Sequence, residues 1–382
     1  MRERDLFVVA APGLLQVVAE ETVAILPAAD LRPTQGGIEL KAAQDLDLCR
    51  LNLRLRAGSR VLCRIAEIRA ASFAELHRRA ARLPWEDYLR AGAPVVIRAS
   101  AKRSRLYHTG GIAERIVKGI HERLGAEPQL VAESEAGPDA QRIIARLLRD
   151  RLTLSIDTSG ELLHRRGYRQ ATAKAPLREN LAAAILLSCL REGDALIDPM
   201  CGAGTLAIEA ALLQSGTAPG HARSFALERW PSLTPGILER ARAELPTPQQ
   251  PSAPIFASDR DDGAITATQS NAARAGVKTW LNTQVADFAS LADIEAPAAR
   301  GLVVTNPPYG VRISARRHLP ELYARLGASL RQRFAHKPSL SWRLALLTPD
   351  PSLAAATGFD LERRLSLKNG GIPIDLWLGP IH

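Results

Sequence analysis

A strand, a glycine-rich turn and a helix follow one another between residues 195 and 214, and this pattern constrains the fold most. Ala195-Leu196-Ile197 is an apolar run of strand length, the turn from Asp198 to Thr205 contains two glycines, and Thr205 to Gln214 has helical periodicity. Strand and helix patterns alternate in the same way from about Ala175 onward. Such alternation is typical of a doubly wound α/β fold with a largely parallel sheet.

The end of this region departs from the parallel pattern. Apolar stretches at 361–367 and 372–378 flank Asn369-Gly370-Gly371, which is a strong β-hairpin signal. Further strands are expected at 255–257, 301–304 and 344–347, with a helix at 177–190. We therefore predict a mostly parallel seven-stranded sheet with an antiparallel C-terminal hairpin. The proline-rich stretch from Pro219 to Pro254 is expected to form a surface excursion between the first two strands.

The first half of the chain combines shorter strands and helices without regular alternation. Strand patterns occur at 6–9, 38–40, 61–65, 94–99 and 152–156, and helical patterns at 14–26, 45–55, 73–83 and 112–124. Ser159-Gly160 is a turn signal, so Glu161 to His164 is expected to return as a strand. This half is therefore interpreted as a mixed α+β region.

The net charge of +10 favours a polyanionic partner, because Lys and Arg side chains that neutralise phosphates release condensed counterions. The four cysteines have no C-x-x-C spacing, which argues against a zinc site or a disulfide framework. No signal-peptide pattern occurs at the N-terminus, and no apolar run approaches the ~20 residues of a membrane span. We expect a cytoplasmic protein that binds no metal and no membrane.

The glycine turn has the composition of a nucleotide-binding loop. Gly202 and Gly204 allow the backbone to approach a ligand at the N-terminus of a helix. The turn also satisfies the dinucleotide pattern G-x-G-x-x-A, but the acid expected ~20 residues further on is absent. The next strand instead ends at Ser258-Asp259, where a carboxylate can accept hydrogen bonds from both hydroxyls of a ribose.

Asn306-Pro307-Pro308-Tyr309 follows the apolar run 302–304, so it lies at the carboxyl end of a strand, where ligands bind in such sheets. The Asn306 Oδ1 atom and the Pro307 carbonyl can accept both hydrogens of an –NH2 group, and Tyr309 can stack on the ring that carries it. Two such acceptors orient a poorly nucleophilic amine toward a methyl donor. The pattern therefore favours methylation of an exocyclic amine.

These motifs resemble motifs I, II and IV of the class I, amino-directed methyltransferases, with Asp198–Thr205, Asp259 and Asn306–Tyr309 as the matching segments. Two further stretches, 104–115 and 166–180, make the chain similar to the THUMP-containing RNA guanine-N2 methyltransferases, especially the RlmL-like members that act on 23S ribosomal RNA. Some members are fused to a second methyltransferase, for which the 382 residues leave no room. The resemblance implies S-adenosylmethionine as cofactor and a flipped base as substrate.

The resemblance also implies roles for individual residues. Asp198, Gly202 and Gly204 would hold the methionine end of the cofactor and Asp259 its ribose. Asp287 would meet the adenine amino group with Phe288 beside the ring. Asn306, Pro307 and Tyr309 would be catalytic and receive the base. Pro199, Thr205 and Asn306 complete the expected cofactor-binding set, and the expected RNA-binding set is Lys102, Arg103, Arg105, His108 and Arg115.

The predicted fold class is α/β, with a Rossmann-like methyltransferase domain preceded by α+β ferredoxin-like and THUMP domains. The expected boundaries are 1–65 for the ferredoxin-like region, 66–157 for the THUMP domain, 158–176 for a linker hairpin and 177–382 for the methyltransferase domain. A monomer is favoured. Asp261 is expected to cap a helix, and Trp230 and Trp377 to lie in the core.

The leading hypothesis is methylation of guanine N2 in 23S ribosomal RNA. Three alternatives stay open. The first is a tRNA guanine-N2 methyltransferase of the same architecture. The second is an adenine-N6 methyltransferase acting on RNA or DNA, since the Asn-Pro-Pro-Tyr motif also serves that chemistry. The third is a ribosome-assembly factor that binds RNA without catalysis, which the intact motif disfavours.

Overall fold

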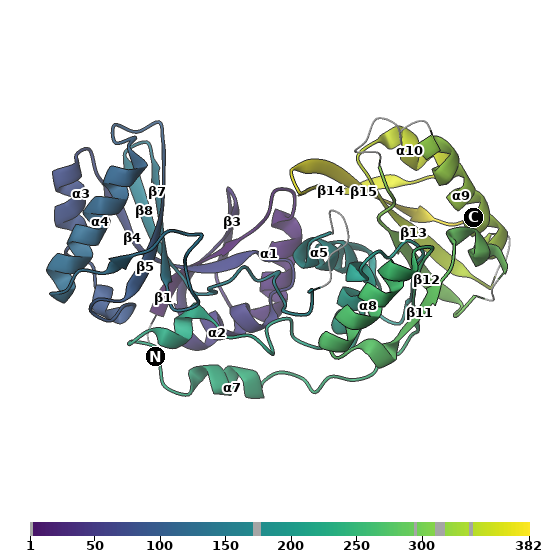
Figure 1. Cartoon of the computed structure of the whole chain (residues 1–382), viewed down its shortest axis with the longest axis horizontal. Helices are drawn as coiled ribbons and strands as arrows, with labels where there is room; N and C mark the ends of the chain where they lie inside the picture. The colour runs from purple at the N-terminus through teal and green to yellow at the C-terminus, as the bar shows by residue number, and fades with distance from the viewer. Residues whose placement is uncertain (1–2, 171–176, 294–295, 310–317, 336–338) are drawn as a thin grey trace. The chain divides into compact units, whose positions relative to one another are not determined.

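The computed structural model describes residues 3–170, 177–293, 296–309, 318–335 and 339–382 (Figure 1). The chain forms two compact units. The first comprises Met1–Ala10, Ala19–Leu163 and Gly220–Glu244, and the second comprises Ala11–Val18, His164–Pro219 and Leu245–His382. No helix in the described part of the chain combines the length and the apolar character needed to cross a membrane.

The first unit is built on an eight-stranded mixed sheet in the order β2-β3-β1-β4-β8-β7-β5-β6. Its strands are β1 (Glu3–Val9), β2 (Leu31–Thr34), β3 (Gly37–Gln44), β4 (Arg60–Arg69), β5 (Pro94–Lys102), β6 (Gln129–Leu130), β7 (Gln141–Leu148) and β8 (Arg151–Asp157). Strand β5 is parallel to β6 and β7, and every other pair is antiparallel. The mixed α+β architecture predicted for this half is confirmed.

Helices α2 (Asp45–Arg54), α3 (Phe73–Ala80) and α4 (Thr109–Leu124) accompany these strands, with a 3-10 turn at Trp85–Asp87. Helix α1 (Leu15–Ile25) belongs to this unit from Ala19 onward. Helices α3 and α4 lie side by side (Figure 1). They approach closely at Gly119, where an added Cβ would lie 2.7 Å from the Ala80 Cβ. Ser72 begins α3 by accepting a hydrogen bond from the Glu75 amide, as an N-cap does.

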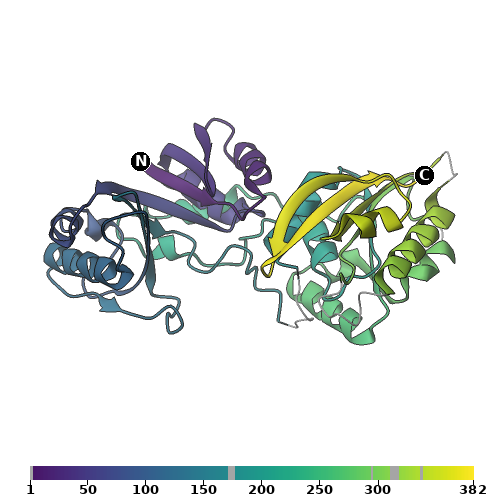
Figure 2. The same ribbon diagram turned by 90° about the horizontal axis from the view of Figure 1, so that it is seen from above.

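The second unit is a seven-stranded sheet in the order β11-β10-β9-β12-β13-β15-β14. Its strands are β9 (Ala195–Asp198), β10 (Ile255–Asp259), β11 (Leu281–Val285), β12 (Arg300–Thr305), β13 (Ser341–Thr348), β14 (Glu362–Asn369) and β15 (Ile372–Pro380). The first five strands of this order are parallel, and β15 is antiparallel to β13 and β14. Figure 2 shows the β14–β15 hairpin in yellow along the edge of the sheet. Both the parallel sheet and the C-terminal hairpin are as predicted.

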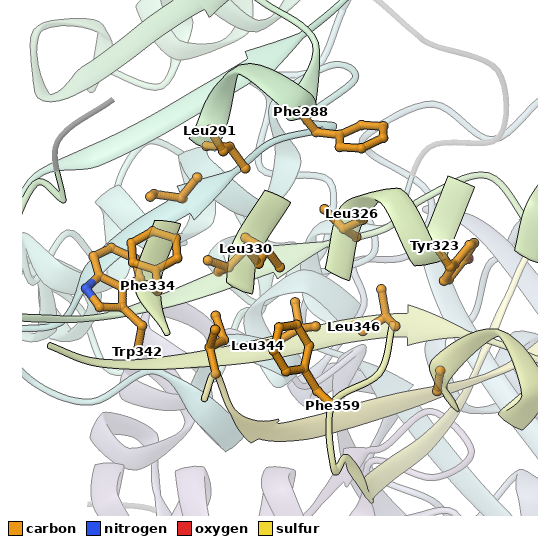
Figure 3. Close-up of a cluster of buried hydrophobic side chains, with 14 of the residues drawn as sticks. Phe288, Leu291, Tyr323, Leu326, Leu330, Phe334, Trp342, Leu344, Leu346 and Phe359 are labelled. Atoms are coloured by element: carbon orange, nitrogen blue, oxygen red, sulfur yellow. The ribbon is translucent and has the colours of Figure 1, made fainter. Parts of the chain in front are cut away.

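The helices of the second unit are α5 (Glu179–Cys189), α6 (Thr205–Gln214), α8 (Asp262–Arg274), α9 (Leu319–Phe334) and α10 (Pro351–Ala356), with 3-10 turns at Lys278–Trp280 and Phe288–Asp293. One face of the sheet packs against α9 and α10. Figure 3 shows this core, in which Phe334 and Trp342 stack with ring centroids 4.4 Å apart. Trp377 packs against the same cluster while partly exposed.

Residues 220–244 of the proline-rich excursion are part of the first unit, although their sequence lies between β9 and β10 of the second. They contain a 3-10 turn at Ala226–Arg229 and helix α7 (Ile237–Ala243), which packs on α2. Trp230 is 3% exposed, and its indole N–H donates to Gln141 Oε1 at 2.8 Å. Its predicted place in a core is confirmed.

One predicted strand is wrong. Glu161 to His164 is not a strand, and the neighbour of β8 is β7, which the sequence analysis did not identify. The hairpin turns at Arg149 and Asp150, which have φ angles of +52° and +61°. Residues 171–176 of the predicted linker lie outside the described residues.

Candidate active site

The order of the strands reverses at β9, which has β10 on one side and β12 on the other. Ile197 of β9 is in register with Val303 of β12. Because both strands are parallel, the turn after Asp198 and the motif after Thr305 leave the sheet at the same edge. Such a reversal point is where doubly wound sheets bind ligands. The two motifs that the sequence singled out are therefore brought together.

The glycine turn has one closed side and one open side. Gly202 and Gly204 have φ angles of +54° and +79°. A Cβ at Gly204 would lie 2.6 Å from Thr268 Cγ2, whereas a Cβ at Gly202 would meet no atom within 4 Å. Gly204 is therefore required by packing, and Gly202 leaves room for a ligand beside the backbone.

Helix α8 holds this turn in place through two side chains that the sequence analysis missed. Thr268 Oγ1 donates to the Gly202 carbonyl at 2.9 Å, and Asn271 Nδ2 donates to the Ala203 carbonyl at 3.1 Å. Asp259 Oδ2 accepts from the Gly202 amide at 3.0 Å. No sequence motif marks Thr268 and Asn271 for this role, because only the packing of α8 brings them to the turn.

Asp198 is a buried acid, with 1% of its surface exposed. Burial raises the pKa of its carboxyl to about 8; a hydrogen bond from the Met200 amide partly opposes this shift, and the nearby Asp259 carboxylate adds to it. Among the described residues, none forms an ion pair with Asp198. A ligand that carries positive charge would therefore favour the carboxylate form.

Arg169 links the segment before the sheet to the start of α6. Its Nε atom donates to Glu179 Oε1 at 2.8 Å, and Nη2 donates to the Leu177 carbonyl at 2.8 Å and to Thr205 Oγ1 at 2.9 Å. Nearby, the Tyr168 hydroxyl donates to the buried Glu209 Oε1 at 3.0 Å. These contacts give Tyr168, Arg169 and Glu179 of the stretch 166–180 a structural role beside the turn.

Asn306 follows β12 directly, and its Oδ1 atom is buried without a hydrogen-bond partner among the described residues. Pro307 is buried, while Pro308 is exposed and Tyr309 is partly exposed. An acceptor that is buried and unpaired is costly unless a ligand supplies the donor. Asn306 therefore has the environment of a group that binds an N–H or O–H donor.

Asp287 and Phe288 follow β11 at the same edge. The Ala286 amide donates to the Asp259 carbonyl at 2.9 Å, which ties this segment to the end of β10. Asp287 Oδ1 accepts from the Ala289 amide at 2.9 Å. Phe288 is 5% exposed and belongs to the core cluster of Figure 3, with the Arg325 guanidinium 5.5 Å from its ring centre. Its role beside an adenine ring stays a prediction.

The residues predicted to bind RNA lie in the first unit, between the end of β5 and the second turn of α4. His108 is the N-cap of α4, and its Nδ1 atom accepts from the Gly111 amide at 2.8 Å. Arg115 lies over the Phe73 ring and 3.3 Å from Glu114. Lys102, Arg103 and Arg105 are exposed.

Two remaining predictions concern a cap and metal ligands. Asp261 is the N-cap of α8 and accepts a hydrogen bond from the Gly263 amide, as expected. Over the described residues, no group of three His, Cys, Asp or Glu side chains is placed to hold a metal ion.

The sheet order, the glycine turn after its first strand and the Asn-Pro-Pro-Tyr motif after its fourth define a Rossmann-like, S-adenosylmethionine-dependent methyltransferase. The site fits that cofactor, because a buried acid without an ion pair suits a cationic methionine moiety and the open side of Gly202 leaves room for it. The chain belongs to the family of RMKL-like methyltransferase domains, whose model matches residues 166–376. Residues 5–62 match the RlmL ferredoxin-like domain.

Known relatives agree with this assignment. The chain is 36% identical to the ribosomal RNA large subunit methyltransferase K/L of Syntrophotalea carbinolica, over 96% of this chain and 52% of that protein. It is 32% identical to a putative RNA methyltransferase of Synechocystis, over 98% of this chain and 96% of that protein. SMU.472, a putative methyltransferase complexed with SAH, superposes with a TM-score of 0.84 at 27% identity, over 99% of this chain and 98% of the other. The chain spans about half the length of the K/L relatives it matches.

Proposed function

We propose that this chain transfers a methyl group from S-adenosylmethionine to the exocyclic N2 amine of a guanine in 23S ribosomal RNA. Transfer to an exocyclic amine is supported above all by the buried, unpaired Oδ1 atom of Asn306, which lies at the point where the strand order of the sheet reverses. An amide oxygen in this position needs a donor, and an –NH2 group provides one.

In this proposal the edge of the sheet holds the cofactor from end to end. Asp198, Pro199, Gly202, Gly204 and Thr205 contact its methionine moiety, Asp259 its ribose and Asp287 its adenine. The Asp259 Oδ2 atom already accepts from the Gly202 amide, so one carboxylate both shapes the turn and faces the ribose. When bound, the cofactor supplies an electrophilic methyl group on its sulfonium.

The chemistry then depends on alignment. The lone pair of a guanine N2 amine is delocalised into the ring, which makes the amine a weak nucleophile. Asn306 Oδ1 and the Pro307 carbonyl accept its two hydrogens and direct the nitrogen toward the methyl group, while Tyr309 stacks on the base. As the N–C bond forms, the bond between the methyl group and the sulfonium sulfur would break with its electron pair going to sulfur, and one amine proton would leave to solvent. The contribution of these residues is orientation and electrostatic stabilisation.

Three observations support RNA as the substrate. The net charge of +10 favours a polyanion. Residues 5–62 match a ferredoxin-like domain of an RlmL family model. Two relatives that align with almost the whole chain are named as a ribosomal RNA methyltransferase and a putative RNA methyltransferase. We propose the THUMP domain over 66–157 as the part that anchors the RNA, with Lys102, Arg103, Arg105, His108 and Arg115 on its surface.

The experiment is methyl transfer from labelled S-adenosylmethionine to nucleic acids from a strain that lacks the gene. We expect label in 23S RNA from that strain and little in 23S RNA from the parent, whose site is already methylated. Transfer RNA and duplex DNA serve as competing substrates in parallel reactions. Label in transfer RNA alone would point to the tRNA enzyme, and label in DNA alone would overturn the proposal.

A further inference from the structure

Tyr107 is 82% exposed and is the most exposed of the large apolar side chains in the described part of the chain. The next in order is Leu130, at 55%. Tyr107 belongs to the segment 103–108, which joins β5 to α4 in the first unit (Figure 1). A ring so exposed gains no packing energy in the fold, and exposed aromatic side chains among basic residues are typical of nucleic-acid-binding surfaces.

The backbone that precedes this ring is held by hydrogen bonds. Ser104 Oγ donates to the Lys102 carbonyl at 3.1 Å and accepts from the Asp150 amide at 3.0 Å. The Asp150 carboxylate in turn accepts from the Arg105 amide at 2.6 Å. These bonds tie the segment to the β7–β8 turn.

The residues next to the ring anchor it further. Leu106 is 7% exposed and points into the core, and His108 caps helix α4. The fold therefore fixes the chain immediately before and after Tyr107 while leaving the ring in solvent. Because the segment is already ordered, little conformational entropy would be lost when a ligand packs on the ring.

The charged side chains of the chain segment around Tyr107 are all basic. Neither Lys102 nor Arg103 forms an ion pair with any residue that the structure describes. The Arg105 side chain is 75% exposed, with its Nε atom 3.8 Å from Asp150 Oδ2. One flat ring with flanking cations matches the chemistry of a nucleotide, whose base offers a π-face and whose phosphates carry negative charge.

We propose that Tyr107 is a stacking platform for one unpaired base of an RNA substrate, with Lys102 and Arg103 against the flanking phosphates. This inference rests on the proposed RNA substrate and adds that the surface selects a single-stranded segment. In a duplex each base is covered by its neighbours in the stack, so a side chain on the protein surface cannot reach its face. The five basic residues predicted from sequence bind phosphates in either form, and Tyr107 supplies the discrimination.

The test measures binding of a fluorescently labelled RNA oligonucleotide by anisotropy, once as a single strand and once in a duplex of the same sequence. We expect Tyr107→Ala to weaken single-strand binding about 5- to 150-fold, which corresponds to the loss of one base-aromatic stack. Duplex binding should change by less than about twofold. Tyr107→Phe keeps the ring and should bind like the wild type. Leu130→Ala, at an exposed apolar position in the same unit, is the matched control.

Salt dependence separates stacking from phosphate contact. Tyr107→Ala should leave the slope of log K against log salt unchanged, because it removes no charge. Lys102→Gln should reduce the magnitude of that slope by about 0.7 on the single strand. Equal losses on single strand and duplex, unchanged single-strand binding by Tyr107→Ala, or a loss in Tyr107→Phe as large as in Tyr107→Ala would overturn the inference. If RNA is not the substrate, the wild type will bind neither the single strand nor the duplex. That result differs from each of the three outcomes that would overturn the stacking role of Tyr107.

Discussion

The Asn306 Oδ1 atom is buried at the end of β12 and accepts no hydrogen bond from the described residues. A buried acceptor without a donor costs about 1–3 kcal/mol, and natural proteins retain such groups mainly where they have a function. Its neighbours fit a function in substrate binding, because Pro307 has no amide hydrogen that could occupy the oxygen.

Asn306→Ala should reduce methyl transfer at least ~100-fold, by analogy with the loss of one preorganised polar contact in other active sites. The free energy of unfolding should stay the same or rise, because the change removes an unsatisfied buried group. Single-turnover transfer rates and urea unfolding measure the two effects. Transfer at the wild-type rate would remove this side chain from the mechanism.

Asp198 should make cofactor binding depend on pH. Its pKa is about 8 in the folded chain without cofactor, so below pH 8 the carboxyl is protonated, and the ammonium group of the methionine moiety, which S-adenosylhomocysteine shares, must displace that proton. Affinity should therefore rise with pH by up to about tenfold per unit below pH 8 and level off above it. The same raised pKa lowers the stability of the free protein as pH rises from about 4 to 8, because only the folded state keeps the proton over that range.

Calorimetric titrations with S-adenosylhomocysteine from pH 6 to 9 measure this dependence, in buffers of different ionisation enthalpy to count protons. Asp198→Asn cannot release a proton. Its affinity for S-adenosylhomocysteine should therefore be lower and should change less with pH over the same range. Wild-type binding that releases no proton at pH 7 would contradict the assignment of this acid to the cofactor.

At the scale of elements, the site depends on how α8 supports the turn after β9. Thr268 donates to the Gly202 carbonyl, and its Cγ2 atom also fills the space where Gly204 lacks a Cβ. Helix α8 begins at Asp262, three residues after Asp259, so one segment of the chain supplies both the acid and the residues that hold the turn.

Thr268→Val keeps the shape and removes the hydroxyl, so the turn should loosen and the Kd for S-adenosylhomocysteine should rise about 2- to 12-fold, the equivalent of one hydrogen bond. Thr266→Val on an exposed position of the same helix is the control and should bind normally. Equal Kd values for both variants and the wild type would show that the turn does not need this support.

Sequence patterns predicted the elements of the second unit well, because strong apolar periodicity and glycine turns coincide there. Helix α6 begins and ends at the residues expected from sequence. Strand β11 was not predicted, since an edge strand with Asn282, Thr283 and Gln284 lacks an apolar run. Phe288 has the sequence context of a ligand-binding residue but is buried in the core.

The elements of the first unit are harder to predict from sequence, for a physical reason. The β7–β8 hairpin turns at Arg149-Asp150, two non-glycine residues with positive φ, so the usual turn signal is absent. Ser159-Gly160 gave that signal instead, and the return strand was placed after it. In the same way, Thr268 and Asn271 could not be assigned to the site, because only the packing of α8 brings them to the glycine turn.

In the whole molecule, the excursion after α6 makes the two units depend on one another in sequence. Residues 220–244 leave the second unit between β9 and β10 and complete the first. Trp230 contacts Tyr88 edge to face at a centroid distance of 5.0 Å, and Arg4 lies over its ring. Thr234 and Arg4 both bind the buried carboxylate of Asp45. The first unit is therefore incomplete without a segment encoded inside the second.

Trp230→Ala should destabilise the first unit by about 3–5 kcal/mol, the typical cost of deleting a large buried aromatic side chain. Hydrogen exchange of the β1, β4 and β8 amides should accelerate, while exchange in β9 and β12 should change little. Trp230→Phe keeps most of the volume and should lose less. Equal acceleration in both sheets would mean that the two units unfold as one.

The identity of the methylated nucleoside tests whether Asn306 directs methyl transfer to guanine N2. RNA methylated by the purified chain with isotopically labelled S-adenosylmethionine is digested to nucleosides and analysed by mass spectrometry. We predict that the label is in N2-methylguanosine and that it is lost with Asn306→Ala. Label in N6-methyladenosine, or label that persists in that variant, would contradict this prediction.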